Sequence, residues 1–207
     1  MKFKTVVFLF FVFYKSVAQD SLATKPVDVT NPILFTEFYG GVAGGSSGGF
    51  FGGLNLNYQT KNNLYTARYT GVVSTKLTAV LFIIPAFINY ETINEYAFLF
   101  GKRYIYNNHS LSYSGGVSIV NRRFLIDYPN NLNLYESQNS FGFPFEVNVK
   151  WFKRAKKPYR IYYGLIPIGK RKVGFGQSVG FKLVGNISKT YFIGVGLNMG
   201  VGWHKIY

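Results

Sequence analysis

Few side chains in this sequence could act as nucleophiles, general bases or metal ligands. The 207 residues include two histidines, His109 and His204, and no cysteine. The lack of cysteine excludes a thiol nucleophile, a thiolate zinc site and a disulfide framework, and we expect neither a metal ion nor a cofactor. A serine nucleophile would need a histidine base beside it. Ser178 and His204 would share one face of neighbouring strands, but no local motif marks either residue.

Charged residues form the second candidate group, because several of them occur in otherwise apolar or glycine-rich stretches. Seven would share the inward face if these stretches are strands of a barrel: Glu37, Arg68, Glu95, Arg103, Glu146, Lys150 and Lys182. A narrow interior buries charges, and buried charges of opposite sign should pair. We therefore predict a structural network of ion pairs that fills the interior. A gated polar path for small solutes is the alternative interpretation.

The segment 153–172 carries a dense cluster of positive charge in a chain whose formal net charge is +15. It contains no acidic residue and eight basic ones: Lys153, Arg154, Lys156, Lys157, Arg160, Lys170, Arg171 and Lys172. Such a segment could bind nucleic acid in a cytosolic protein, but an exported chain would meet lipid phosphates instead. We predict that it binds anionic outer-membrane lipid, with lipopolysaccharide phosphates as one candidate, and no nucleic acid. A solvated basic turn is the alternative.

The elements that must position these residues follow from a period of two in the hydrophobic pattern. In 191–207 the odd positions are mostly bulky and apolar, as at Val195, Leu197 and Met199, whereas the even positions are mostly glycine or polar. Strands place alternate residues on opposite faces. The pattern recurs and predicts eight strands, at 34–43, 50–58, 64–73, 95–106, 110–119, 139–151, 173–183 and 191–207. Short polar turns at 61–63 and 107–109 are typical of antiparallel hairpins.

Strand length and the composition of the second face favour a membrane barrel over a soluble sandwich. The candidate strands run for about ten residues, which suits a tilted transmembrane strand. Their second face is rich in glycine and serine, and small side chains fit the narrow interior of an eight-stranded barrel. We predict an all-β fold, an antiparallel up-and-down transmembrane β-barrel of eight strands. Two alternatives remain: a barrel of ten strands, since 76–84 and 158–167 could also form strands, and a secreted soluble sandwich.

The C-terminal strand carries a more specific signal. The chain ends on the aromatic Tyr207, and Trp203 follows a series of apolar residues at two-residue steps, although Lys205 interrupts it. This pattern resembles the terminal strand of bacterial outer-membrane β-barrel proteins, and 34–207 resembles their small eight-stranded members. The resemblance implies that the barrel-assembly machinery reads Trp203 and Tyr207 as an assembly signal. Its members include adhesins, structural barrels, pores and a few lipid-modifying enzymes.

The first eighteen residues have the pattern of a secretory signal peptide. Two lysines precede a ten-residue apolar run at 5–14, and small residues stand at the −3 and −1 positions of a cleavage after Ala18. Ten apolar residues are too few to span a membrane as a helix. We predict a signal peptide at 1–18, an extended lead-in at 19–32 and a barrel at 33–207. Export of a barrel protein predicts the outer membrane of a diderm bacterium.

These observations predict a non-enzymatic small outer-membrane barrel with an envelope-structural or a lipid- or surface-binding role. An outer-membrane lipid-modifying enzyme and a narrow solute channel are the two alternatives. The enzyme would depend on a histidine such as His204 with a nearby serine and an acid, as in the few lipid-modifying members of the family that the chain resembles. The channel would need a continuous polar path past the inward charges.

Overall fold

The computed structural model describes residues 33–46, 48–80, 84–126, 134–152, 157–161, 166–173 and 175–203. The predicted signal peptide and lead-in lie outside the described residues, as do the basic residues Lys153, Arg154 and Lys156 and the C-terminal residues His204 and Tyr207. In the part of the chain that the structure describes, no helix has the length and apolar character to cross a membrane.

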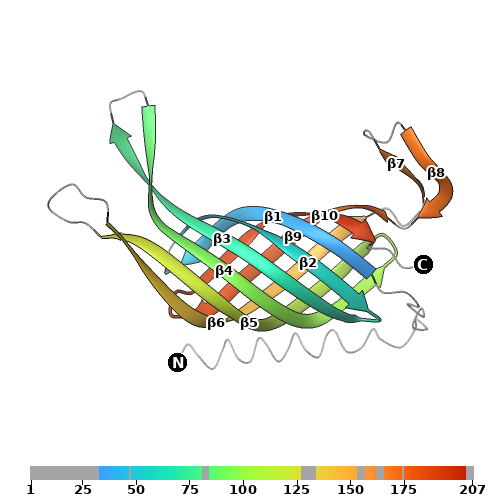
Figure 1. The fold of residues 1–207 in the computed structure, drawn as a ribbon, viewed down its shortest axis with the longest axis horizontal. Coiled ribbons are helices and arrows are strands. Elements are labelled where there is room, and N and C mark those ends of the chain that lie inside the picture. The colour runs from blue at the N-terminus through green and yellow to red at the C-terminus, as the bar shows by residue number, and fades with distance from the viewer. Residues whose placement is uncertain are drawn as a thin grey trace, which may run out of the picture.

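Eight strands form one antiparallel sheet that closes into a barrel (Figure 1). In chain order they are β1 (Ile33–Gly45), β2 (Gly49–Thr60), β3 (Asn63–Val80), β4 (Ile84–Tyr106), β5 (His109–Ile126), β6 (Leu134–Phe152), β9 (Phe175–Ser188) and β10 (Phe192–Trp203). Each strand pairs with its neighbours in the chain, except that β6 pairs with β9, and β10 pairs with β1 to close the sheet. The predicted eight-stranded up-and-down barrel is confirmed. The sandwich alternative is wrong, because a single sheet closes on itself.

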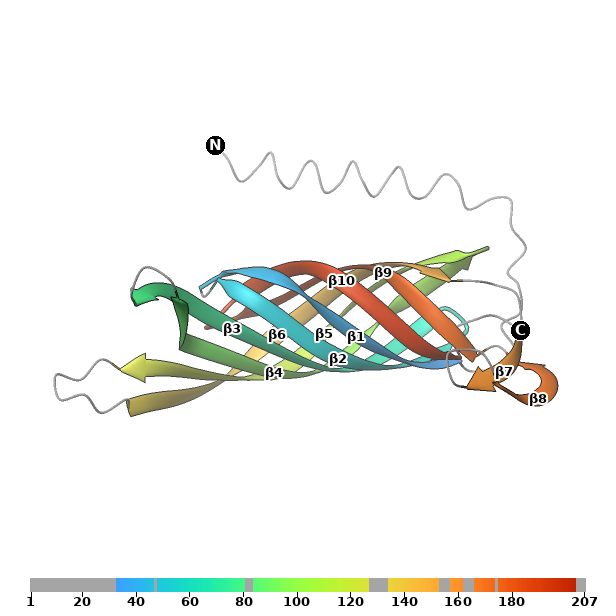
Figure 2. The ribbon, with the colours of Figure 1, turned by 90° about the horizontal axis from the view of Figure 1, so that it is seen from above.

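The two remaining strands, β7 (Lys157–Ile161) and β8 (Ile166–Val173), form a separate two-stranded sheet. Both ribbon views place this hairpin beyond the end of the barrel (Figures 1 and 2). The barrel wall has no gap for it, since β6 pairs directly with β9 from Gly142↔Ser188 to Phe152↔Ser178. The alternative with ten barrel strands is therefore wrong: 158–167 contains strand residues, but they stay outside the wall.

The two ends of the barrel differ in their connections. One end, which we call the termini end, carries the start of β1, the end of β10 and the β7–β8 hairpin, and here two-residue turns join β2 to β3 and β4 to β5. The first residues of these turns, Lys61 and Asn107, have φ values of 54° and 43°, as tight hairpins require. At the opposite or far end, the β3–β4 and β5–β6 hairpins project past the rim (Figures 1 and 2).

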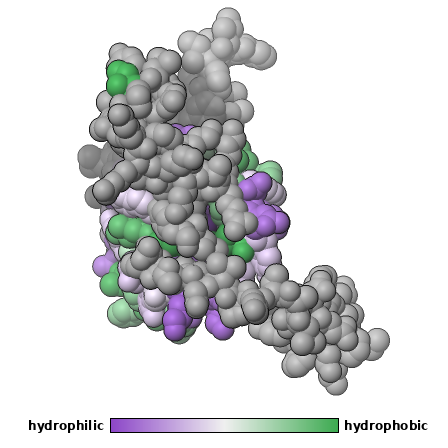
Figure 3. All heavy atoms as spheres, turned by 90° about the vertical axis from the view of Figure 1, so that its right-hand side faces the viewer, coloured by the Kyte–Doolittle hydropathy of each residue, from purple (hydrophilic) through white to green (hydrophobic). Residues whose placement is uncertain are grey.

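The outer and inner faces of the barrel have opposite character. Outward side chains such as Phe38, Phe98 and Phe181 are 57–58% exposed, whereas inward charged side chains such as Glu95 are almost fully buried. Soluble proteins show the reverse arrangement, and an apolar outer band with a polar interior suits a barrel surrounded by lipid. Figure 3, which views the termini end, shows hydrophobic and hydrophilic residues side by side around the barrel.

Candidate functional site: the charged barrel interior

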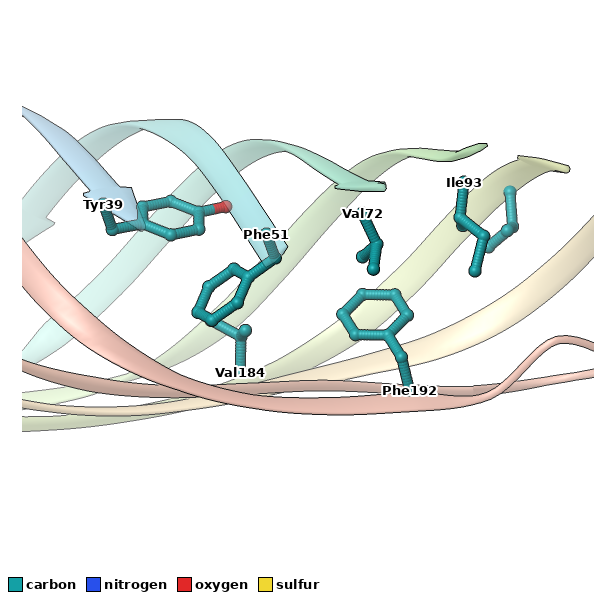
Figure 4. Packing of buried hydrophobic residues seen from close by; sticks show 7 residues of the cluster. Tyr39, Phe51, Val72, Ile93, Val184 and Phe192 are labelled. Atoms are coloured by element: carbon teal, nitrogen blue, oxygen red, sulfur yellow. The ribbon is translucent and has the colours of Figure 1, made fainter. Parts of the chain in front are cut away.

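Side chains divide the barrel interior into three layers along its axis. Toward the far end lies an apolar layer made of Tyr39, Phe51, Val72, Ile93, Val120, Val184 and Phe192. Its members come from different strands and point into the same space (Figure 4). A smaller apolar layer at the termini end contains Ile33, Phe35 and Leu64. The charged residues lie between these layers, as the inward order Phe35, Glu37, Tyr39 along β1 shows.

Six charged side chains form one continuous chain of ion pairs in the middle layer. Acids and bases alternate along it in the order Glu95, Arg68, Glu146, Lys182, Glu37, Lys150. The first four links have N–O distances of 3.0, 3.4, 3.1 and 3.0 Å, and Lys150 Nζ completes the chain by pairing with Glu37 Oε1. Every member is at most 3% exposed. The three acidic and three basic side chains balance, so the six-residue network has no formal net charge.

Asparagine side chains complete the hydrogen bonding of the carboxylates. Asn55 Nδ2 lies between two of them and donates to Glu146 Oε2 at 3.1 Å and to Glu37 Oε2 at 3.3 Å. Asn148 Nδ2 donates to Glu37 Oε1 at 3.2 Å. A buried ion pair is tolerated only when hydrogen bonds satisfy the remaining lone pairs, and these amides supply part of that requirement. The network is therefore held at fixed positions from several strands at once.

Arg103 is also buried but lies apart from this chain, toward the termini end. Its Nη1 donates to Gln59 Oε1 at 2.9 Å and its Nε to Ser110 Oγ at 3.3 Å. The guanidinium lies 4.6 Å from the centroid of the Phe35 ring, and Lys150 Nζ lies 4.3 Å from the same centroid. A cation over an aromatic face gains electrostatic attraction. Of the seven residues selected from the sequence, the structure thus links six and places Arg103 beside the apolar layer.

Sequence reasoning selected charged side chains and missed their neutral partners. Asn55 and Asn148 were not predicted, nor was Asn186, whose Nδ2 donates to Glu95 Oε1 and to Ser118 Oγ. Asn186 lies beyond the predicted strand 173–183, but Asn55 and Asn148 occupy inward positions in the same alternating stretches as the charges. Their position on the inward face was therefore a usable signal. The hydrogen-bond partner of each asparagine could not be predicted in this way, because the partner depends on strand register.

The described residues do not bring a histidine to the candidate serine. His109 is exposed, and its ring stacks on Tyr106 with the centroids 5.6 Å apart. Ser178 is buried on the inward face, 6% exposed, whereas its expected partner His204 lies outside the described residues. Within the described ranges, no cluster of three or more histidine or acidic side chains could hold a metal ion. The arrangement that the structure does show is a fixed, neutral, polar core.

The basic segment reaches the termini end of the barrel. Lys157 and Arg160 belong to β7, and 170–172 belongs to β8. The backbone register pairs Lys157 with Val173 and Pro158 with Lys172. Five of the eight predicted basic residues are thus carried by one hairpin outside the wall, on the side where the chain enters and leaves the barrel.

Aromatic residues surround the barrel near the same end. Trp203, one half of the predicted assembly signal, is 46% exposed on β10, and its ring meets Phe175 edge-on at 5.3 Å. Trp151 meets Phe181 edge-on at 6.0 Å. Such residues are typical of the girdle that a membrane barrel places at the lipid interface. Tyr207, the other half of the signal, lies outside the described residues.

Comparisons with known proteins bear on the fold. No protein-family model and no curated protein matches the chain. The crystal structure of Neisserial surface protein A matches with a TM-score of 0.50 at 10% identity, covering 82% of this chain and 96% of that one. The attachment invasion locus protein Ail of Yersinia pestis, in complex with the heparin analogue sucrose octasulfate, gives a TM-score of 0.48 at 11% identity, with 83% and 97% covered.

The N-terminal β-barrel domain of Pseudomonas aeruginosa OprF gives a TM-score of 0.43 at 9% identity, covering 83% of this chain and 99% of that one. At such identities the likeness extends to the fold alone. The likeness to Neisserial surface protein A and the closed eight-stranded sheet show that the chain has the fold of a small eight-stranded outer-membrane barrel, as the alternating pattern and the C-terminal strand predicted.

Proposed function

We propose that this protein is a non-enzymatic barrel of the outer membrane, a closed scaffold for the segments that project from the lipid. The observation that carries this proposal is the six-residue network between two apolar layers. An eight-stranded barrel has little space beyond its own side chains. A solute would have to displace paired, buried charges, and breaking such pairs is strongly unfavourable. The closed interior favours a scaffold over the channel.

Planar lipid bilayers test whether the interior is closed. The reconstituted wild-type protein is expected to produce no discrete conductance steps, because the network and both apolar layers block the axis. A porin purified in the same detergent serves as the control for insertion, and heat-modifiable gel mobility shows that the protein is folded. Reproducible steps of one amplitude from the folded protein would contradict the scaffold and favour the channel.

The outer-membrane location implies assembly through the C-terminal strand. In this proposal Trp203 lies in the aromatic girdle and Tyr207 ends the strand that the barrel-assembly machinery reads. The exposed apolar outer face supports the membrane location. The signal peptide and its cleavage near Ala18 are part of the same proposal, since a barrel must be exported before it is inserted.

Deletion of Tyr207 tests the assembly signal. The truncated protein is expected to reach the periplasm with its signal peptide removed but to accumulate less folded barrel in the outer membrane. Fractionation combined with heat-modifiable mobility measures both steps. A Tyr207→Phe variant, which keeps the terminal aromatic ring, should behave as the wild type. Normal levels of folded barrel after the deletion would remove Tyr207 from the signal.

The basic hairpin gives the scaffold a lipid-binding role at the termini end. If both termini are periplasmic, the hairpin faces the periplasmic leaflet, where phospholipid phosphates are the available anions and lipopolysaccharide lies on the opposite side. Each lysine or arginine near an anionic membrane surface strengthens binding to that surface by about 1 kcal/mol. We therefore favour phospholipid over lipopolysaccharide as the partner. The protein is expected to prefer anionic over zwitterionic lipid, and a charge-matched pair of variants tests this preference in the Discussion.

A further inference from the structure

The outer wall of the barrel contains a hollow of about 360 Å³ across β4, β5 and β6, three strands that lie side by side in Figure 1. Its outward-facing border is formed by Phe100, Lys102, Tyr113, Gly115, Phe145 and Val147. Gly115 points outward between Phe100 on β4 and Phe145 on β6, with which it is paired. Because glycine has no side chain, the wall is depressed at this point. We call this depression the Gly115 hollow.

The position of Phe145 explains why the hollow stays open. This residue has a glycine directly opposite on both neighbouring strands, Gly115 on β5 and Gly185 on β9. The Phe145 ring occupies the place that a Cβ atom at Gly185 would take, whereas a Cβ atom at Gly115 would meet only the Pro144 carbonyl oxygen, at 3.7 Å. One aromatic ring therefore covers one of the two glycines and leaves the other uncovered.

A cation and two tyrosines lie on the side of the hollow nearer the termini end. Lys102 is exposed on the outer face and lies four residues before the end of β4, about 10 Å along the barrel axis from the rim for a strand tilted as in membrane barrels. The rings of Tyr104 and Tyr113 lie 6.3 Å apart beside it. Lysine near a membrane interface extends its ammonium group toward the headgroups, and tyrosine is enriched at that depth.

We propose that the Gly115 hollow binds one phospholipid of the leaflet at the termini end. An acyl chain occupies the depression between Phe100 and Phe145, and the phosphate meets the Lys102 ammonium group. Apolar walls and a single cation at the headgroup side match the two ends of such a molecule. This inference rests on the proposed membrane location but not on the basic hairpin, which lies outside the wall.

Native mass spectrometry of the full-length protein in detergent micelles tests this site. The probe is a phosphatidylglycerol with two defined chains, added to delipidated protein. At a salt concentration that screens the basic hairpin, wild type is expected to retain one lipid, and Gly115→Leu, which fills the hollow, should reduce the affinity for that lipid about tenfold or more. Gly52→Leu is the matched control: Gly52 also faces outward, and a Cβ atom there would meet only the Tyr39 carbonyl oxygen, at 3.6 Å. This control should bind the lipid as the wild type does.

Two further comparisons separate the contributions of the headgroup contact and of the basic hairpin to lipid binding from the contribution of the hollow. Lys102→Gln is expected to weaken the binding of phosphatidylglycerol about fivefold. It should leave the binding of a diacylglycerol with the same acyl chains unchanged, because that lipid has no phosphate. Replacing four basic residues of the hairpin by glutamine should leave the single bound lipid in place. If Gly115→Leu remains folded by heat-modifiable mobility and still binds as the wild type does, or if Gly52→Leu is equally impaired, the site is not the Gly115 hollow. Either outcome would leave the scaffold proposal standing.

Discussion

Replacing Glu146 by leucine is expected to lower the free energy of unfolding by about 3–5 kcal/mol, as measured by denaturant titration of the barrel in micelles. Glu146 is the central acid of the six-residue network, between Arg68 and Lys182. Its removal leaves three cations and two anions in a region closed off by apolar layers. The remaining excess of positive charge is buried, and an uncompensated buried charge is the source of the large effect.

A conservative variant separates charge from hydrogen bonding. The amide of Glu146→Gln can still accept hydrogen bonds from Arg68 and Lys182, so this variant should lose less stability than Glu146→Leu. Glu136→Leu is the matched control on the same strand, because Glu136 is exposed and exposed charges contribute little. Equal and negligible effects of all three substitutions would show that Glu146 is not part of a buried network.

A double variant tests the order in which the ion pairs follow one another in the six-residue network. Removing Lys182 together with Glu146 leaves two complete pairs, Glu95 with Arg68 and Glu37 with Lys150. The combination of Glu146→Leu and Lys182→Leu is therefore expected to destabilise the barrel by less than the sum of the two single variants. Neighbours in one network commonly show interaction energies of about 0.5–3 kcal/mol. Simple additivity would mean that the two side chains do not interact.

The strands were predictable because the two faces of a membrane barrel meet opposite surroundings. Where both surroundings are present, the period of two is clear, as in β10. Past the far rim a strand no longer has lipid on one side and the barrel interior on the other, and the alternation of apolar and polar residues ends there. The predicted segment 95–106 is therefore only the part of β4 within the barrel wall, since β4 begins at Ile84. The same reason explains the separate β7–β8 hairpin, which lies outside the wall.

The candidate site was predictable as a set of inward residues but not as an ordered chain. Lys182 and Glu37 are 145 residues apart in the sequence and meet because closure brings β1 and β9 to either side of β10. Strand register then decides which acid faces which base, and a single sequence does not specify the register of every pair. The separation of Arg103 from the network follows from the same geometry, since it lies nearer the termini end.

Neutralising the basic hairpin is expected to remove most of the preference for anionic lipid. The variant replaces Lys157, Lys170 and Arg171 of the hairpin, together with Lys156, which precedes it in the sequence, by glutamine. Four cations near an anionic surface contribute about 4 kcal/mol at most. The measurement is the ratio of phosphatidylglycerol to phosphatidylcholine that the full-length protein retains from mixed micelles in native mass spectrometry. The fold should persist, because the hairpin does not contribute a strand to the barrel wall.

A charge-matched control distinguishes a local field from the total charge of the protein. Four cations lie toward the far end by their positions in the strands: Lys76 in β3, Arg122 and Arg123 in β5, and Lys189 between β9 and β10. Their replacement by glutamine removes the same number of charges. This control should retain the preference of the wild type, and the wild-type preference itself should fall as salt rises, since screening acts over about 8 Å at physiological ionic strength. If the two quadruple variants lose the preference equally, net charge is responsible. If the hairpin variant keeps the full preference, the segment is a solvated turn, and the proposed lipid-binding role of the hairpin is wrong.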